Sequence, residues 1–385
     1  MEQRKTDYYI LISTLLLICV GCMTVYSASA ILSNEKYHDS YYFLKREIIF
    51  CLIAIGCMIT MMRIDYHKLW KVVYPFMGLT LFFCVLVAIP GIGIKAGGAR
   101  RWLGIGGFTF QPSEMVKLSL ILFMAYSLAK KREKMESFTV GVLPHLLVAG
   151  LMMGLILLQK DLGTTFTLAV VLMVLLFVGG TKISYLAGAI LAAIPALYFL
   201  VFSVDYRRQR IMAFLDPWTH MGDSGFQIIQ SYVGFNNGGI WGLGLGQGRQ
   251  KLFYLPAAHT DFILSVVGEE LGLFGVLFVL TLFVILIVRG FRTALKAPDL
   301  FGMYLALGIV SLISVQSLIN FGVVMGLLPT KGLPLPFISY GGTSVIIMSM
   351  CIGIVLNIAS QAGTRDPAVE TALPTQQDGR KVMFR

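Results

Sequence analysis

Charge is scarce in this sequence. Asp, Glu, Lys and Arg together make up 13% of its 385 residues, whereas 57% of the residues are hydrophobic. With a mean hydropathy of +0.78, this composition excludes an ordinary soluble domain. Cysteine is also sparse, and all six cysteines fall within apolar runs without the spacing of a zinc site or a disulfide framework. We therefore expect the cysteines to pack in the core and predict no metal centre.

Long apolar runs are what the sequence does have. Ten segments approach or exceed the length of about 20 residues that spans a bilayer, at about 8–30, 47–62, 70–90, 112–129, 140–158, 162–180, 184–203, 262–288, 300–327 and 341–360. Lipid cannot satisfy free backbone polar groups, so these spans must be helices. We predict an all-α integral membrane protein with one domain at 1–361. A long outer loop at 205–261 separates spans seven and eight, and a disordered cytoplasmic tail follows at 362–385.

Basic residues predict the orientation. The segments on the same side as the N-terminus hold the larger share of lysine and arginine, which places positions such as Lys131 and Arg292 in the cytoplasm. Basic residues on the opposite side are therefore unexpected, and they suggest an anionic ligand such as a phosphate at the outer membrane surface. Attraction to anionic lipid headgroups is the alternative. These outer cations are Lys95, Arg100, Arg101, Arg207, Arg208, Arg210, Arg249, Lys251 and Lys331.

Asp261 is the candidate catalytic residue. It follows a polar, basic approach that includes Lys251 and His259, and it stands directly before an apolar span that carries Glu269 and Glu270 near its start. An ionisable group at the mouth of a membrane helix is a candidate for function. The alternative is that Asp261 caps the helix, a role that aspartate fills well.

Further polar residues gather near the outer ends of other spans. The glycine-rich segment 91–110 carries Arg100, Arg101 and Trp102, which suit a phosphate and a sugar face, or simply a flexible interfacial loop. Glu114 and Lys117, three apart at the start of a span, form either a structural ion pair or the lining of a polar cavity. The polar interruption at 159–164 predicts an outer turn that borders a cavity.

Several motifs resemble the SEDS family (shape, elongation, division and sporulation) over residues 8–360. They are ARRW (99–102), QPSE (111–114), DLGT (161–164), YLPAAHTDF (254–262), GEELG (268–272) and PLPFISYGG (334–342). The segments LPTKG (328–332) and QKLFYL (250–255) are more similar to the division (FtsW) branch than to the elongation (RodA) branch.

The resemblance implies a peptidoglycan glycosyltransferase that polymerises lipid II. In that activity Asp261 is the base that activates the GlcNAc 4-hydroxyl, and Arg100, Arg101 and Lys331 hold the diphosphate of an undecaprenyl-linked donor. The other substrate-binding candidates are Trp102, Glu114, Lys117, Lys251, His259 and Glu270, the last of which could instead serve the dipole of the helix.

The resemblance also implies a setting and partners. These are the bacterial inner membrane at the division septum, an extracytoplasmic active site, a class B penicillin-binding protein transpeptidase, other division proteins and membrane lipids, with no nucleic acid. No cofactor is required, although a divalent cation could assist. A lipid II flippase, an elongation-type polymerase and a structural scaffold for division proteins are the alternatives, because a polytopic protein with charges inside its spans also fits a transporter.

Overall fold

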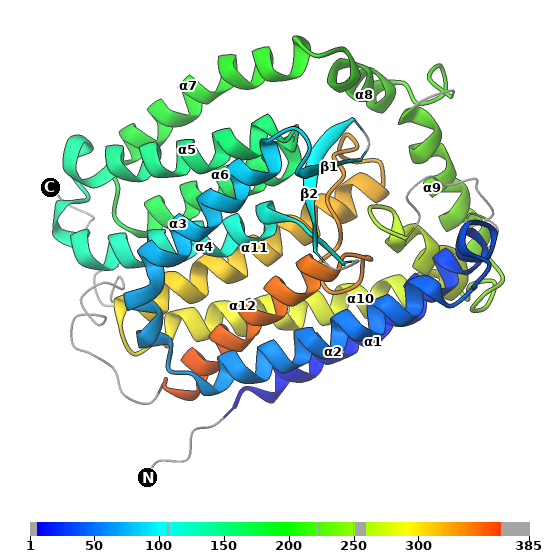
Figure 1. The fold of residues 1–385 in the computed structure, drawn as a ribbon, viewed down its shortest axis with the longest axis horizontal. Helices are drawn as coiled ribbons and strands as arrows, with labels where there is room; N and C mark the ends of the chain where they lie inside the picture. Colours follow the sequence, from blue (N-terminus) through cyan, green and yellow to red (C-terminus); the bar gives the residue numbers. More distant parts are fainter. Residues whose placement is uncertain are drawn as a thin grey trace, which may run out of the picture.

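The computed structural model describes residues 6–96, 98–105, 108–221, 224–248, 250 and 259–362. Helices dominate, and most of them are joined by short connections (Figure 1). The α-helices are α1 (Tyr8–Tyr37), α2 (Tyr42–Arg63), α3 (Leu69–Ala88), α4 (Pro112–Lys131), α5 (Leu143–Leu158), α6 (Leu162–Val178), α7 (Ile183–Phe202), α8 (Asp205–Leu215), α9 (Ser224–Gly238), α10 (Ile263–Leu295), α11 (Leu300–Val324) and α12 (Gly342–Ser360). Three short turns of helix are η1 (Tyr66–Lys68), η2 (Arg132–Lys134) and η3 (Phe138–Val142).

Each predicted apolar segment lies on a helix. Seven helical stretches of the described residues are long and apolar enough to cross a membrane, namely α1, η1 with α3, η3 with α5, α7, α10, α11 and α12. α6 is apolar but shorter, whereas α2 and α4 carry charged residues. The protein is therefore a mostly helical, multi-pass membrane protein.

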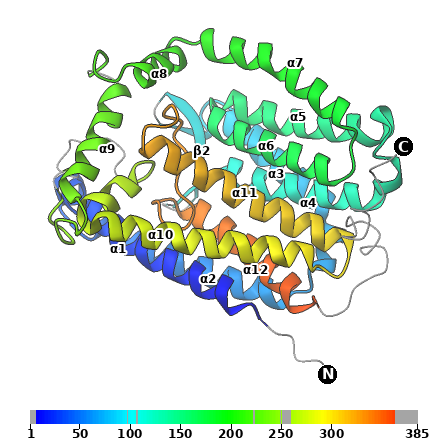
Figure 2. The same cartoon turned by 180° about the vertical axis from the view of Figure 1, so that it is seen from behind.

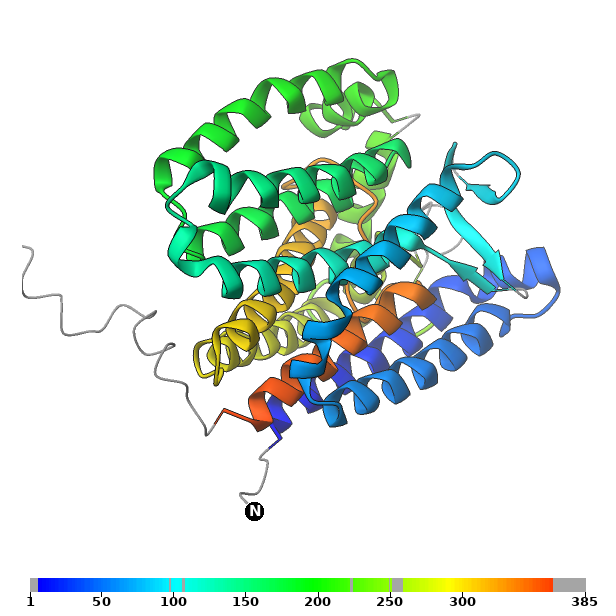
Figure 3. The same ribbon diagram turned by 60° about the vertical axis from the view of Figure 1, so that its left-hand side comes forward.

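The most buried helices form the centre of the bundle. In the most apolar window of each helix, 83% of α11 and 78% of α12 is buried, against 11% of α7. α11 lies against α4, α6 and α10, and α12 lies against α2. α7 runs along the edge of the bundle in Figure 2, and the turned view of Figure 3 agrees. The polar residues of α11 and α4 are therefore enclosed by protein, while one long side of α7 faces outward.

A small β-sheet corrects the prediction of an all-α fold. β1 (Gly93–Ala96), β2 (Ala99–Ile105) and β3 (Phe108–Phe110) form an antiparallel sheet in the order β1-β2-β3, with Leu103 opposite both Gly93 and Phe110. Ala99 and Leu103 are buried, whereas Arg100 is exposed, as the alternation of a strand requires. The many glycines of this segment hid that alternation in the sequence.

The segment predicted as one long outer loop contains two helices, α8 and α9, between α7 and α10. The prediction of a disordered tail at 362–385 concerns residues that, after Ala362, lie outside the described residues. The cysteines are all free, and Cys51, Cys84 and Cys351 are buried as expected. Cys19 is exposed instead, because an apolar run does not show which of its faces meets lipid and which meets protein.

Candidate functional site

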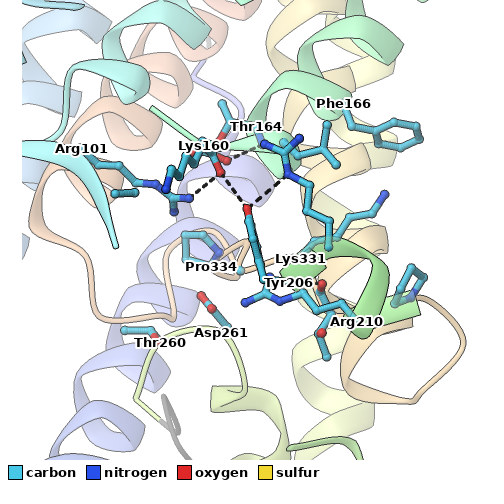
Figure 4. Close-up of a pocket in the computed structure, with 18 of the residues that line it drawn as sticks. Arg101, Lys160, Thr164, Phe166, Tyr206, Arg210, Thr260, Asp261, Lys331 and Pro334 are labelled. Carbon is cyan, nitrogen blue, oxygen red and sulfur yellow. Dashed lines mark hydrogen bonds between the residues drawn. The ribbon is translucent and has the colours of Figure 1, made fainter. Parts of the chain in front are cut away.

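A cavity of about 760 Å³ lies at the end of the bundle where α10 and α12 begin. We call it the main cavity, and Figure 4 shows part of its lining. Its polar lining includes Arg101, Trp102, Gln111, Glu114, Lys160, Asp161, Thr164, Tyr206, Arg207, Arg210, Thr260, Asp261, Thr330, Lys331, Tyr340 and Ser344. Its apolar lining includes Leu162, Phe166, Leu197, Val201 and Ile211. Because Leu197 and Val201 belong to peripheral α7, a polar chamber adjoins an apolar wall at the edge of the bundle.

Asp261 stands in the turn before α10 and lines this cavity. The N-cap residue of α10 is Phe262, and no side chain caps this helix. Asp261 therefore does not act as the helix cap, which was the alternative role. The Asn320 side-chain amide of α11 donates to the carbonyls of Asp261 at 2.9 Å and Leu333 at 2.8 Å. A Cβ on Gly332 would lie 3.3 Å from Asp261 Oδ2. The backbone of the 325–341 loop thus closely flanks the Asp261 carboxylate, and α11 holds the backbone of Asp261 in place.

The surroundings of Asp261 make it a usable base. Burial raises the pKa of this carboxyl to about 6, and Asp161 adds to the increase, while Arg210 and Arg101 oppose it. The guanidinium of Arg210 points toward Asp261 in Figure 4. At neutral pH the carboxylate is therefore mostly ionised yet more basic than an ordinary aspartate, which suits proton abstraction.

Lys331 is the lysine of the loop that follows α11. Burial lowers the pKa of its ammonium group, and its Nζ lies 4.0 Å from the centroid of the Phe166 ring on α6. Within the described residues it forms no ion pair. A half-buried ammonium without a carboxylate partner among the described residues is ready to bind an anionic group.

Arg101 and Arg210 are two further cations of the lining. Arg101 donates from Nε to the Gln159 carbonyl at 2.9 Å and from Nη2 to the Lys160 carbonyl at 2.7 Å, which joins β2 to the turn before α6. Arg210 Nη1 lies 3.4 Å from the Thr330 carbonyl, and its guanidinium lies over the Tyr206 ring. Both contacts leave donor N–H groups for a ligand, since each guanidinium carries five.

A buried polar network supports the cavity from below. Glu114 Oε1 lies 2.7 Å from Lys117 Nζ, which also donates to Gln316 Oε1 at 3.2 Å. Gln316 Nε2 in turn donates to the Pro334 carbonyl at 2.8 Å. The second carboxylate oxygen of Glu114 is buried and has no hydrogen-bond partner in the described part of the chain. Glu114 can therefore accept a hydrogen bond from a hydroxyl of a ligand in the main cavity.

The structure brings together five of the predicted site residues, since Arg101, Trp102, Glu114, Lys331 and Asp261 all line the main cavity. The polar turn at 159–164 borders it as predicted, with Asp161 accepting from the backbone N–H and hydroxyl of Thr164 at 3.0 and 2.9 Å. Sequence reasoning noted Arg207 and Arg210 only as outer cations and missed Tyr206, Thr260 and Thr330.

The other predicted residues lie elsewhere. Arg100 is exposed and outside the cavity lining, and the ring of His259 packs against Phe43 and Tyr340. Lys117 is buried beneath the cavity, and Glu270 accepts from Ser27 Oγ in the contact between α1 and α10. Their substrate-binding roles stay predictions.

Lys251, the remaining predicted residue, lies outside the described residues. No group of three or more His, Cys, Asp or Glu side chains in the described part is arranged to hold a metal ion.

The motifs around this cavity correspond to a known family. The sequence model of the FtsW, RodA and SpoVE cell cycle proteins matches residues 7–364. The chain belongs to this family. The resemblance to the SEDS proteins is thereby confirmed.

Similar relatives include the probable peptidoglycan glycosyltransferase FtsW of Geobacter metallireducens, 49% identical over 94% of this chain and 96% of that protein. The stage V sporulation protein E of Bacillus subtilis is 43% identical over 93% of this chain and 99% of that one.

Two solved structures are similar throughout. The rod shape determining protein RodA of Thermus thermophilus has a TM-score of 0.67 and 26% identity, over 94% of this chain and 98% of that one. A chain from a peptidoglycan synthase complex, described as coordinating polymerization and crosslinking, has a TM-score of 0.77 and 26% identity, over 93% of this chain and 99% of that one.

Proposed function

We propose that this family member is a peptidoglycan glycosyltransferase of the division type, which polymerises lipid II into glycan strands. The observation that carries the proposal is the half-buried Asp261, with its raised pKa, in a chamber lined by Lys331, Arg101 and Arg210. A base next to unpaired cations suits transfer of a sugar from a diphosphate leaving group. The names of the relatives support the same activity.

The placement of these groups supports the following reaction. Asp261 takes the proton of the GlcNAc 4-hydroxyl of one lipid II molecule as that oxygen attacks the MurNAc anomeric carbon of the donor chain. The bond between this carbon and the diphosphate oxygen breaks, and the electron pair leaves with undecaprenyl diphosphate. Lys331, Arg101 and Arg210 stabilise the charge on the diphosphate, and the apolar wall beside α7 accommodates the lipid portions. A single displacement inverts the anomeric carbon.

We also propose ten membrane spans, adding α2, α4 and α6 to the seven apolar stretches. Thr6 and Ala362, near the two ends of the described chain, line one pocket at the end of the bundle opposite the main cavity. An even number of crossings returns the chain to its starting side, whereas seven would not. The proposed setting is the bacterial inner membrane at the septum, with α8 and α9 and the main cavity outside the cytoplasm.

A transpeptidase of the penicillin-binding class is the proposed partner. The similar chain solved in a complex that coordinates polymerization and crosslinking supports this pairing. Lipid II and the growing undecaprenyl-linked glycan are the proposed substrates.

The test is Asp261→Asn in the purified protein, alone and with its transpeptidase partner. The change keeps the size of the side chain but removes its basicity, and loss of a general base reduces rates by about 10²–10⁴-fold. We expect a folded, partner-binding protein that makes almost no glycan from lipid II. Asp39→Asn is the matched control, because Asp39 lies in the α1–α2 turn outside the cavity and pairs with Lys45 at 2.8 Å.

Two outcomes would contradict this assignment. Glycan synthesis at the parental rate by folded Asp261→Asn protein would exclude the general base. A flippase would make no polymer in either form, while the parent moved lipid II between leaflets.

A further inference from the structure

A second cavity, of about 500 Å³, lies at the end of the bundle opposite Asp261, and we call it the basal pocket. It is framed by the start of α1 and by the far ends of α10 and α12, the two helices that begin beside the main cavity. In Figure 1 the start of α1 and the ends of α10 and α12 lie toward the lower left of the bundle. The proposed glycosyl transfer makes no use of this pocket.

Among the described residues that line the basal pocket, Asp7 is the one carboxylate, and the protein already engages it. Asp7 Oδ2 accepts from Arg289 Nε at 2.9 Å and from Arg289 Nη2 at 2.7 Å. Its other oxygen caps α1 by accepting from the backbone N–H groups of Tyr9 and Ile10. Arg289 also lies over the Tyr9 ring, 4.9 Å from the centroid. Asp7 therefore neutralises Arg289 and fixes one wall of the pocket.

Two further cations of the basal pocket are not neutralised. Arg292 and Lys296, four residues apart at the end of α10, line the pocket and are exposed. Among the described residues neither side chain forms an ion pair or a hydrogen bond. The carbonyl end of α10 offers only about half a negative charge. Two full positive charges exceed it, so the pocket favours an anion.

The surroundings of the pocket favour a lipid as the source of that anion. The parts of α1 and α10 that frame the pocket also carry the exposed apolar side chains Tyr9, Ile12, Val288 and Leu295, and the Tyr9 ring contacts Arg289 of the lining. A tyrosine at such a position is typical of the boundary between headgroups and acyl chains. The small side chain of Ala359 on α12 leaves space between the helix ends. A phospholipid could place its phosphate at the two cations and its acyl chains along the exposed apolar side chains of α1 and α10.

We propose that the basal pocket binds the phosphodiester headgroup of an anionic glycerophospholipid, with Arg292 and Lys296 as the donors to phosphate. Each basic residue near a membrane surface strengthens such binding by roughly five-fold, so removal of both weakens it by roughly 30-fold. The same two cations should add little to the binding of a lipid that has no net charge.

The experiment is native mass spectrometry of the full-length protein with phosphatidylglycerol or phosphatidylcholine added to the detergent. We expect tight retention of phosphatidylglycerol by the parent, weak retention of phosphatidylcholine, and a loss of roughly 30-fold in Arg292→Gln/Lys296→Gln. The matched control is Lys68→Gln/Lys71→Gln, which removes two exposed cations from the same end of the bundle but outside the pocket. Ala359→Leu fills the pocket without changing its charge and should also reduce retention.

Three results would overturn the proposal. The first is equal loss in the pocket variant and in the control, which would indicate general surface charge. The second is equal retention of the two lipids by the parent. The third is displacement of phosphatidylglycerol by inorganic phosphate at millimolar concentration, which would indicate a site for a soluble anion. If the double variant does not fold, Ala359→Leu still decides, because unchanged retention by that folded variant excludes the pocket.

Discussion

Asp261 is subject to two opposing influences that together set its chemistry. Burial favours the neutral acid, whereas Arg210 and Arg101 favour the carboxylate, and burial is the larger effect because the pKa ends at about 6. The arginines keep the pKa of this carboxyl from rising further, so that it is mostly ionised at neutral pH, and burial makes the carboxylate a stronger base than an ordinary aspartate. The cations of the main cavity therefore serve the base as well as the diphosphate.

The first prediction at this scale is a bell-shaped pH dependence of kcat/KM for lipid II polymerisation. As the pH falls below about 6, Asp261 gains a proton and the rate should fall about tenfold per pH unit. At alkaline pH, Lys331 should lose its charge earlier than an ordinary lysine, because burial lowers its pKa. Rates measured across the pH range, with size-exclusion profiles as a control for folding, test both limbs.

The variant Lys331→Arg distinguishes the alkaline limb, assigned to Lys331, from the acid limb, assigned to Asp261. Arginine stays charged at every accessible pH, so the alkaline limb should move to higher pH while the acid limb stays in place. An acid limb that is absent in the parent, or that moves in Lys331→Arg, would contradict the assignment of that limb to Asp261.

At the scale of elements, α10 is built around a break. Gly272 has φ 65° and ψ −162°, which interrupts the helix. The backbone carbonyls of Glu269 and Glu270 instead accept from the N–H groups of Leu243 and Gly244, both at 3.0 Å. The segment after α9 thereby supplies the hydrogen bonds that the helix lacks. It fixes the outer segment against the same helix that begins beside Asp261.

Gly272→Ala tests this arrangement. An alanine Cβ would overlap the backbone of Gly242 and Ile240, and the positive φ is itself unfavourable for alanine. We expect a loss of about 1–3 kcal/mol in the free energy of unfolding, together with reduced glycan synthesis. Gly150→Ala on α5 is the control, because a Cβ there meets open space. Thermal unfolding of both purified variants provides the measurement, and equal melting temperatures would show that the break carries no strain.

At the scale of the whole molecule, the parts of the fold that a local sequence pattern specifies were predictable. An apolar run long enough for a bilayer forces a helix, so each predicted segment falls on a helix. Glycines hid the sheet, and the mixed composition of α8 and α9 gave no apolar run.

The site was predictable only in part, because a sequence shows local patterns but not the contacts between distant segments. Arg100 and Arg101 are neighbours on β2, yet Arg101 lines the cavity and Arg100 is exposed outside it, which the sequence pattern alone did not show. Glu270 comes nine residues after Asp261, so the rise of the helix places it more than about 10 Å further along α10. It therefore does not line the main cavity. The contributions of Arg210 and Asn320 depend on contacts between distant segments.

The last prediction concerns the orientation of the whole molecule. Lys95 on β1 and Lys68 in η1 are both exposed and lie at opposite ends of the bundle, near the main cavity and near the end of α12 respectively. The bias of basic residues predicts that Lys95 faces outward and Lys68 the cytoplasm. In a background that lacks the six native cysteines, Lys95→Cys should react with an impermeant maleimide on intact cells, and Lys68→Cys only after lysis. The reverse pattern would place Asp261 and Lys331 in the cytoplasm, away from the proposed site of glycan synthesis.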